Sequence, residues 1–188
     1  TVKRRLQPAR HVIRSKLQPA RLAIRSRISH KMIIAPLAVE WITKTFDQLT
    51  VDELYDVLQL RQSVFVVEQK CWYLDADGLD KQSLHLLGRL SSGRLACYLR
   101  IVPPGHRFNE PSIGRVVVDN NLRRHRIGTS LMTRGVELVE ERYPTFGIFL
   151  SAQKYLEHFY RSFGFTSTGH EYLEDGIPHV DMYRAKRG

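Results

Sequence analysis

An apolar strand that runs through a cationic loop into a helix is the feature that most constrains this chain. Residues 112–119, "SIGRVVVD", have the apolar run of a strand, and residues 127–143 have helical periodicity. The loop between them carries four cationic or potentially cationic side chains, Arg123, Arg124, His125 and Arg126. The first N–H groups of a helix lack partners within it, and the helix dipole there favours negative charge. This arrangement predicts a site for a phosphate-like anion.

Gly128 strengthens that prediction, because a residue without a Cβ lets an anion approach the backbone. Arg123 and Arg126 can add charge-assisted hydrogen bonds, worth about 1.5–3 kcal/mol each when well aligned. The loop lacks the glycines of the phosphate-binding P-loop and of the dinucleotide fingerprint. The alternative to an anion site is a solvated charged surface.

The rest of the chain indicates an α+β domain over residues 36–188. Apolar runs predict strands over residues 39–46, 84–90, 95–103, 112–119, 146–153 and 177–185. Helical patterns cover residues 50–69, 127–143 and 155–165. Thr50 and Glu53 form a capping box for the first helix, and Gly164 ends the third. This order predicts a mixed, mostly antiparallel twisted sheet with helices on both faces, in which residues 177–185 close the sheet.

The positive charge of the chain lies in its N-terminal extension. Of the 29 Lys and Arg residues, ten lie in residues 1–31, which contain no Asp or Glu. The remaining 19 are balanced by 19 acidic residues, so charge gives the domain no general affinity for nucleic acid. Nucleic-acid or acidic-surface binding is therefore an alternative function for the extension alone.

The extension also contains a repeat, because "LQPARHVIRS" (6–15) returns as "LQPARLAIRS" (17–26). We expect residues 1–35 to lie outside the fold. Their Arg-rich, acid-free composition is typical of organellar transit segments, while a disordered extension or a natural start at Met32 are the alternatives.

Two cysteines, Cys71 and Cys97, form neither a disulfide framework nor a metal-ligand set. A reducing compartment, the cytoplasm, is the expected location, with an organelle as the alternative if the extension is a transit segment. No apolar run reaches the ~18 residues of a transmembrane helix. The chain gives no indication of its oligomeric state.

Two separated stretches resemble the GNAT acyltransferases. "VVVDNNLRRHRIGTSLM" (116–132) resembles motif A, in which Arg123 and Gly128 match the outer positions and Arg126 replaces the usual middle glycine. "FLSAQKYLEHFYRSFGF" (149–165) resembles motif B. The stretches "LRQSVFVVEQKCWYLDADGLDKQSLHLLG" (60–88) and "YLEDGIPHVDM" (172–182) are similar to the ElaA-like branch. The resemblance covers about residues 38–184.

The resemblance implies that acetyl-coenzyme A is the donor, with no metal, and that a primary amine of a small molecule or protein is the acceptor. Acyl transfer from another donor is an alternative on the same fold. The residues implied in coenzyme binding are Val116, Val117, Val118, Arg123, Arg124, His125, Arg126, Ile127, Gly128, Thr129 and Ser130. The diphosphate would lie on the N–H groups of about Arg126 to Ser130, and the pantetheine arm along the strand of Val116 and Val118.

Catalysis would use Tyr160, at the motif B tyrosine position, as the general acid, since a phenol stays protonated at neutral pH. Its alternative role is a core aromatic. Glu68 is the candidate base, because apolar neighbours would raise the pKa of its carboxyl; a solvent-facing glutamate is the alternative. Glu174 and His179 are expected in the acceptor pocket. His85 is an alternative base there, although a hydrogen-bonded core histidine fits its apolar neighbours better.

The loop 71–82 is acidic, with aspartates at positions 75, 77 and 80. These carboxylates would either keep the loop hydrated, which we favour, or bind the positive charge of the acceptor. Their spacing lacks the distal glutamate of a calcium loop, which argues against metal.

Overall fold

The computed structural model describes residues 37–187. The extension predicted over residues 1–35, with its repeat, lies outside the described residues. No helix within residues 37–187 is long and apolar enough to cross a membrane.

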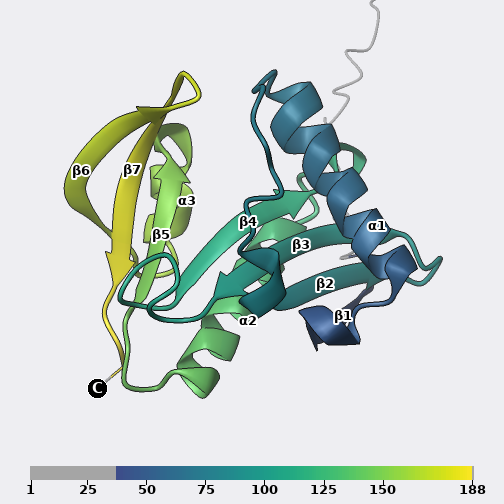
Figure 1. Cartoon of the computed structure of the whole chain (residues 1–188), viewed down its shortest axis with the longest axis horizontal. Helices are drawn as coiled ribbons and strands as arrows, with labels where there is room; N and C mark the ends of the chain where they lie inside the picture. Colours follow the sequence, from purple (N-terminus) through teal and green to yellow (C-terminus); the bar gives the residue numbers. More distant parts are fainter. Residues whose placement is uncertain (1–36, 188) are drawn as a thin grey trace, which may run out of the picture. The chain divides into compact units, whose positions relative to one another are not determined.

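Within residues 37–187, seven strands form one sheet in the order β1-β2-β3-β4-β5-β7-β6 (Figure 1). The strands are β1 (Val39–Thr45), β2 (Leu84–Leu90), β3 (Leu95–Val102), β4 (Ser112–Val118), β5 (Ile148–Gln153), β6 (Thr166–Glu174) and β7 (Ile177–Arg184). In this sheet of the described residues β4 and β5 pair in parallel, and the other neighbours are antiparallel. The predicted mixed, mostly antiparallel sheet is confirmed.

The sequence prediction omitted β6 and misplaced β7. β7 was expected to close the sheet, but it lies between β5 and β6. The residues of β6, "TSTGHEYLE", are mostly exposed because β6 is an edge strand. Such a strand has no alternation of apolar and polar residues, which is the signal on which strand prediction depends.

The α-helices of the described part are α1 (Val51–Arg61), α2 (Ile127–Arg142) and α3 (Glu157–Arg161). The capping box that begins α1 is confirmed, with Thr50 Oγ1 accepting from the Glu53 N–H and Glu53 accepting from the Thr50 N–H. The first helix was predicted to reach residue 69; α1 instead continues as a π-helical segment, η2 (Gln62–Glu68). The third helix is also shorter than predicted, since residues 154–156 form a 3₁₀ turn.

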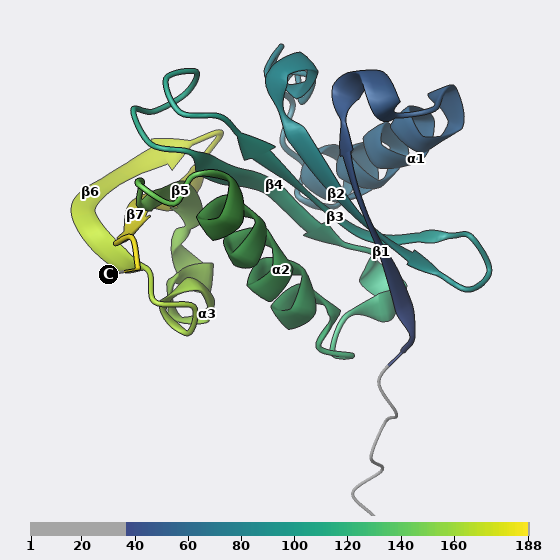
Figure 2. The ribbon, with the colours of Figure 1, turned by 90° about the horizontal axis from the view of Figure 1, so that it is seen from below.

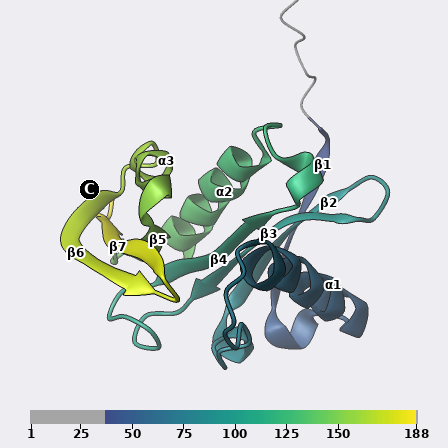
Figure 3. The same cartoon turned by 90° about the horizontal axis from the view of Figure 1, so that it is seen from above.

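Helix α1 covers one face of the sheet, and α2 and α3 cover the other (Figures 2 and 3). Successive residues of a strand point to opposite faces, and β2 shows this directly. Leu86 packs in the cluster that contains Leu131 and Val136 of α2, whereas Leu87 packs in the cluster of Val57 of α1. Both faces of the central strands are therefore buried.

The sheet splits between β4 and β5. The register of β3 and β4 shifts between Tyr98 and Arg100, and in β4 Arg115 has φ +52°, so β4 carries a bulge. Within residues 37–187, β4 and β5 pair in register only at Ser112 and Phe149, near their N-terminal ends. Their C-terminal ends diverge in Figure 1, which opens the sheet beside the start of α2.

Candidate active site

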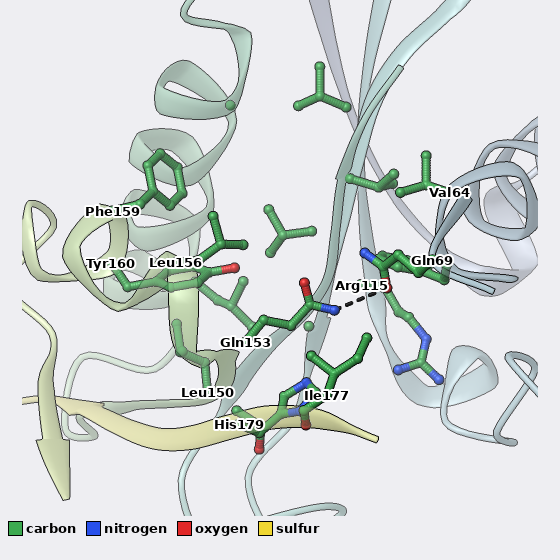
Figure 4. A pocket seen from close by; sticks show the side chains of 18 of the residues that line it. Val64, Gln69, Arg115, Leu150, Gln153, Leu156, Phe159, Tyr160, Ile177 and His179 are labelled. Carbon is green, nitrogen blue, oxygen red and sulfur yellow. Dashed lines mark hydrogen bonds between the residues drawn. The ribbon is translucent and has the colours of Figure 1, made fainter. Parts of the chain in front are cut away.

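A cavity of about 1140 Å³ lies where β4 and β5 diverge. Its lining includes Val116 and Val118 of β4, Gly128 at the start of α2, Tyr160 of α3 and His179 of β7. In Figure 4, Tyr160 of α3 and Gln153 of β5 lie on one side of the cavity. Gln69, which follows η2, lies on the opposite side. The cavity therefore joins the predicted anion loop to the predicted general acid.

The start of α2 offers three N–H groups to this cavity. The Ser130 N–H donates to the Arg126 carbonyl oxygen at 3.1 Å, which is the first hydrogen bond of the helix. The N–H groups of Ile127, Gly128 and Thr129 precede that bond and have no partner within the helix. The prediction extended the anion site to Ser130, but the N–H of Ser130 is occupied and its side chain does not line the cavity.

Gly128 keeps space open at this point. A Cβ built on Gly128 would lie 3.6 Å from Val118 Cγ2 and 3.9 Å from Phe159 Cζ. Both neighbours line the cavity, and both distances are ordinary van der Waals contacts. The protein would therefore tolerate a methyl group here, but the methyl group would occupy the cavity beside the unpaired N–H groups.

Arg126 has the left-handed conformation that glycine adopts most easily, with φ 60° and ψ 11°. It stands where the GNAT pattern usually has glycine. The loop therefore has a backbone conformation that suits glycine at this position. For an L-residue such as Arg126 this conformation costs about 1–2 kcal/mol.

Most of the residues predicted for coenzyme binding line this cavity. They are Val116, Val117, Val118, Arg123, Arg124, Arg126, Ile127, Gly128 and Thr129. His125 is the exception besides Ser130, since it does not line the cavity. Among residues 37–187, the buried Nδ1 of His125 has no hydrogen-bond partner.

Glu68 differs from its prediction. Its two carboxylate oxygens accept from Arg123 at 2.7 and 2.9 Å, in a bidentate pair that lies in solvent. These hydrogen bonds from Arg123 lower the pKa of Glu68 and outweigh the opposing effect of burial. The prediction that apolar neighbours raise this pKa is wrong, because the cationic loop lies beside Glu68.

Tyr160 lies in the wall of the cavity with 7% of its surface exposed. Its hydroxyl points into the cavity in Figure 4. Burial raises the pKa of Tyr160 well above its ordinary value. The phenol therefore stays protonated at neutral pH and can donate a proton, but it is a poor base.

His85 lies outside the cavity. It is fully buried, with Nδ1 2.8 Å from Tyr98 Oη and Nε2 3.0 Å from the Asp80 carbonyl oxygen. Both ring nitrogens are thus hydrogen-bonded in the core, and burial lowers the pKa of the imidazole. The structure agrees with a core histidine and removes His85 from the acceptor-site residues.

The three loop aspartates also differ from expectation. Asp75 and Asp80 are buried, and the three carboxylates pair with three arginines. The ion pairs are Arg61–Asp75, Arg61–Asp80, Arg100–Asp80, Arg100–Asp77, Arg115–Asp75 and Arg115–Asp77, at 2.6–3.1 Å. The expectation of a hydrated loop is wrong: the loop is fixed to β3, β4 and α1, and its carboxylates are already neutralised.

Glu174 and His179, which were predicted for the acceptor pocket, line the far end of the cavity. His179 Nε2 lies 3.7 Å from Glu174 Oε2, and only 11% of the His179 side chain is exposed. In Figure 4 the ring of His179 faces the cavity beside Ile177 and Gln153.

One polar contact across the cavity was missed. Gln153 Nε2 donates to Gln69 Oε1 at 3.0 Å, and Figure 4 shows this bond bridging the two walls. The two residues are 84 positions apart, one at the end of β5 and the other after η2. No local pattern in the sequence could have paired them.

Known proteins resemble this chain in sequence. The model of the acetyltransferase (GNAT) domain matches residues 55–186. A protein of Schizosaccharomyces pombe is 43% identical over 145 residues, 77% of this chain and 95% of the relative. The protein ElaA of Escherichia coli is 40% identical over 148 residues, 78% of this chain and 96% of ElaA.

Solved structures agree. An acyl-CoA N-acyltransferase of Pseudomonas aeruginosa is 41% identical with a TM-score of 0.75, over 79% of this chain and 100% of the other. The crystal structure of Escherichia coli ElaA gives a TM-score of 0.74 over 78% of this chain and 99% of ElaA. The chain therefore belongs to the GNAT family of acyltransferases. Within that family it is ElaA-like, as its relatives and the motifs in its sequence agree.

Proposed function

We propose that this enzyme transfers an acetyl group from acetyl-coenzyme A to a primary amine of a small molecule or protein. One observation carries the proposal: a single cavity connects unpaired N–H groups at the start of α2 with the buried hydroxyl of Tyr160. GNAT proteins in general use acetyl- or acyl-coenzyme A.

The residues present suit such a donor. The N–H groups of Ile127, Gly128 and Thr129 would hold the diphosphate, with the guanidinium groups of Arg124 and Arg126 adding positive charge. The β4 backbone near Val116 and Val118 faces the opening and would bind the pantetheine amides, because β5 does not pair with β4 there. The thioester would then lie near Tyr160.

Tyr160 would act when the carbon–sulfur bond breaks. The amine nitrogen attacks the thioester carbonyl and forms the carbon–nitrogen bond, and the sulfur leaves with the electron pair. The sulfur would take the Tyr160 proton as the bond breaks. Because a phenol is a weaker acid than a thiol, this transfer is unfavourable alone and is driven by the reprotonation of the Tyr160 oxygen. The Tyr160 oxygen recovers a proton from the nitrogen, which sheds one on becoming an amide.

The acceptor would enter at the end of the cavity lined by Glu174 and His179. Glu174 and Asp175, at the β6–β7 turn, add negative charge that attracts an ammonium group. The carboxylates of the acidic loop do not compete for this charge, since arginines neutralise them.

The test measures the free thiol released from acetyl-coenzyme A in the presence of monoamines, diamines or peptides with a free amino terminus. Tyr160→Phe should lower kcat by about 10²–10⁴ and leave coenzyme affinity nearly unchanged. Tyr55→Phe, on the exposed side of α1, is the control. Equal turnover in Tyr160→Phe and the wild type would remove Tyr160 from the mechanism.

A further inference from the structure

The general base, which would remove a proton from the acceptor ammonium group, is the catalytic group that the sequence predicted least well. Glu68 is held by Arg123, and Asp77 by Arg100 and Arg115. His106 and Asp175 line the cavity but are exposed. Among the lining residues of the described chain, His179 combines a largely buried side chain with a ring nitrogen that no cation occupies.

The tautomer of His179 is set by its backbone partner. His179 Nδ1 lies 2.9 Å from the carbonyl oxygen of Ile177. A carbonyl oxygen can only accept, so Nδ1 must carry the hydrogen. In the neutral ring, Nε2 then carries the lone pair and can accept a proton.

A stack of rings fixes the orientation of His179. Its ring stacks on Tyr172 of β6, with centroids 5.8 Å apart and planes inclined by 22°, and Tyr172 stacks on His170 at 5.1 Å and 26°. Asp181 anchors the stack, because Tyr172 Oη donates to it at 3.3 Å and His170 Nδ1 lies 2.8 Å from it. These contacts hold the imidazole before any ligand binds.

The groups around the His179 ring come from β5, β6 and β7 itself. From β6, the Glu174 carboxylate lies 3.7 Å from Nε2, and Tyr172 stacks beside the ring. On β7 itself, Asp181 is the nearest acid along the strand and is bonded to His170. From β5, the residue paired with His179 is the uncharged Gln153.

We propose that His179 is the general base of the reaction. Its Nε2 takes one proton from the acceptor ammonium, which leaves a neutral amine to attack the thioester, and the imidazolium passes that proton to solvent. Tyr172 and the Ile177 carbonyl are positioning groups that present Nε2 to the acceptor. This inference rests on the proposed function, because it needs an amine acceptor.

The kinetic test compares His179→Gln with the wild type, using the amine that releases most thiol in the panel above. We expect kcat at pH 7 to fall about 10²-fold or more. Activity of the variant should rise about tenfold per pH unit towards the ionisation of the amine, whereas the wild type reaches a plateau. Added imidazole should partly restore His179→Ala. His158→Gln, an exposed histidine of α3, is the control.

A second measurement does not depend on activity. Long-range ¹H–¹⁵N spectra of the full chain report the tautomer of each histidine, and the His179 signal is assigned by its loss in His179→Gln. We expect neutral His179 to carry its hydrogen on Nδ1. A hydrogen on Nε2, or a variant with the wild-type pH profile, would overturn the base assignment. A wild type that binds no coenzyme would instead overturn the proposed function.

Discussion

Arg126→Gly separates the backbone role of this residue from its charge. Arg126 is the residue before the first turn of α2, and its φ of 60° places it in the left-handed region. Replacing it by alanine removes the guanidinium but keeps the unfavourable backbone. Replacing it by glycine removes both, so the difference between the two variants isolates the conformation.

The magnitude follows from two opposing terms. The left-handed conformation costs an L-residue about 1–2 kcal/mol. A glycine avoids this cost. Its greater conformational freedom in the unfolded state, however, lowers the free energy of unfolding by about 0.4–1 kcal/mol. The Gly variant should therefore be about 0.5–1 kcal/mol more stable than the Ala variant, which raises Tm by about 1–4 °C in a domain of this size.

The assay is thermal and urea unfolding of the wild type, Arg126→Gly and Arg126→Ala, followed by circular dichroism. Titration with acetyl-coenzyme A should show a similar loss of affinity in both variants, about 10-fold or more, because each lacks the same charged donor. Equal stability of the two variants would refute the left-handed conformation. A loss of affinity in Arg126→Ala alone would refute the role of the charge.

Three further changes test other parts of the structure. Glu68→Gln removes the carboxylate that binds Arg123. Acetyl-coenzyme A should then bind about 2- to 5-fold more tightly, as measured by calorimetry, with Glu141→Gln as the control. Weaker binding to Glu68→Gln would contradict this prediction. Burial raises the pKa of Asp77 and of Asp80, but their arginine partners outweigh burial and hold both values below normal. The stability that these two carboxylates contribute is thus present above the unfolded pKa of about 4 and is lost as the pH falls below it. The urea midpoint should therefore drop below about pH 4, and it should drop less in Asp77→Asn. An equal drop in the variant and the wild type would count against the aspartate–arginine pairs. Gly164→Ala should cost about 1 kcal/mol in urea unfolding, because Gly164 has φ +84° and a Cβ would lie 3.3 Å from Arg184 Nε; unchanged stability would show that the turn adapts.

The parts of the fold that local sequence determines were predicted well. The capping box of α1 needs only Thr50 and Glu53, three positions apart, and the turn after α3 needs only a glycine. The loop that leads into α2 was equally visible, because strand, charge and helix follow one another. Strand β6 was not, because an exposed edge strand carries no apolar period.

Most residues that the motifs indicated line one cavity, whereas contacts between distant segments were not predicted. Glu68 and Arg123 are 55 positions apart, and their contact changes Glu68 from a candidate base into a partner of the anion loop. The pairing of the acidic loop with Arg61, Arg100 and Arg115 likewise joins distant segments. The role proposed for His179 depends on a carbonyl and a ring stack that the folded hairpin brings together.

The most direct measurement is calorimetric titration of acetyl-coenzyme A into the wild type and Gly128→Ala. The methyl group makes only ordinary contacts with Val118 and Phe159, so the variant should fold with unchanged or slightly higher Tm. A diphosphate held on the first turn of α2 predicts binding to the wild type and affinity at least about tenfold weaker in the variant. Equal affinity in the two proteins, or no binding to the wild type, would contradict it.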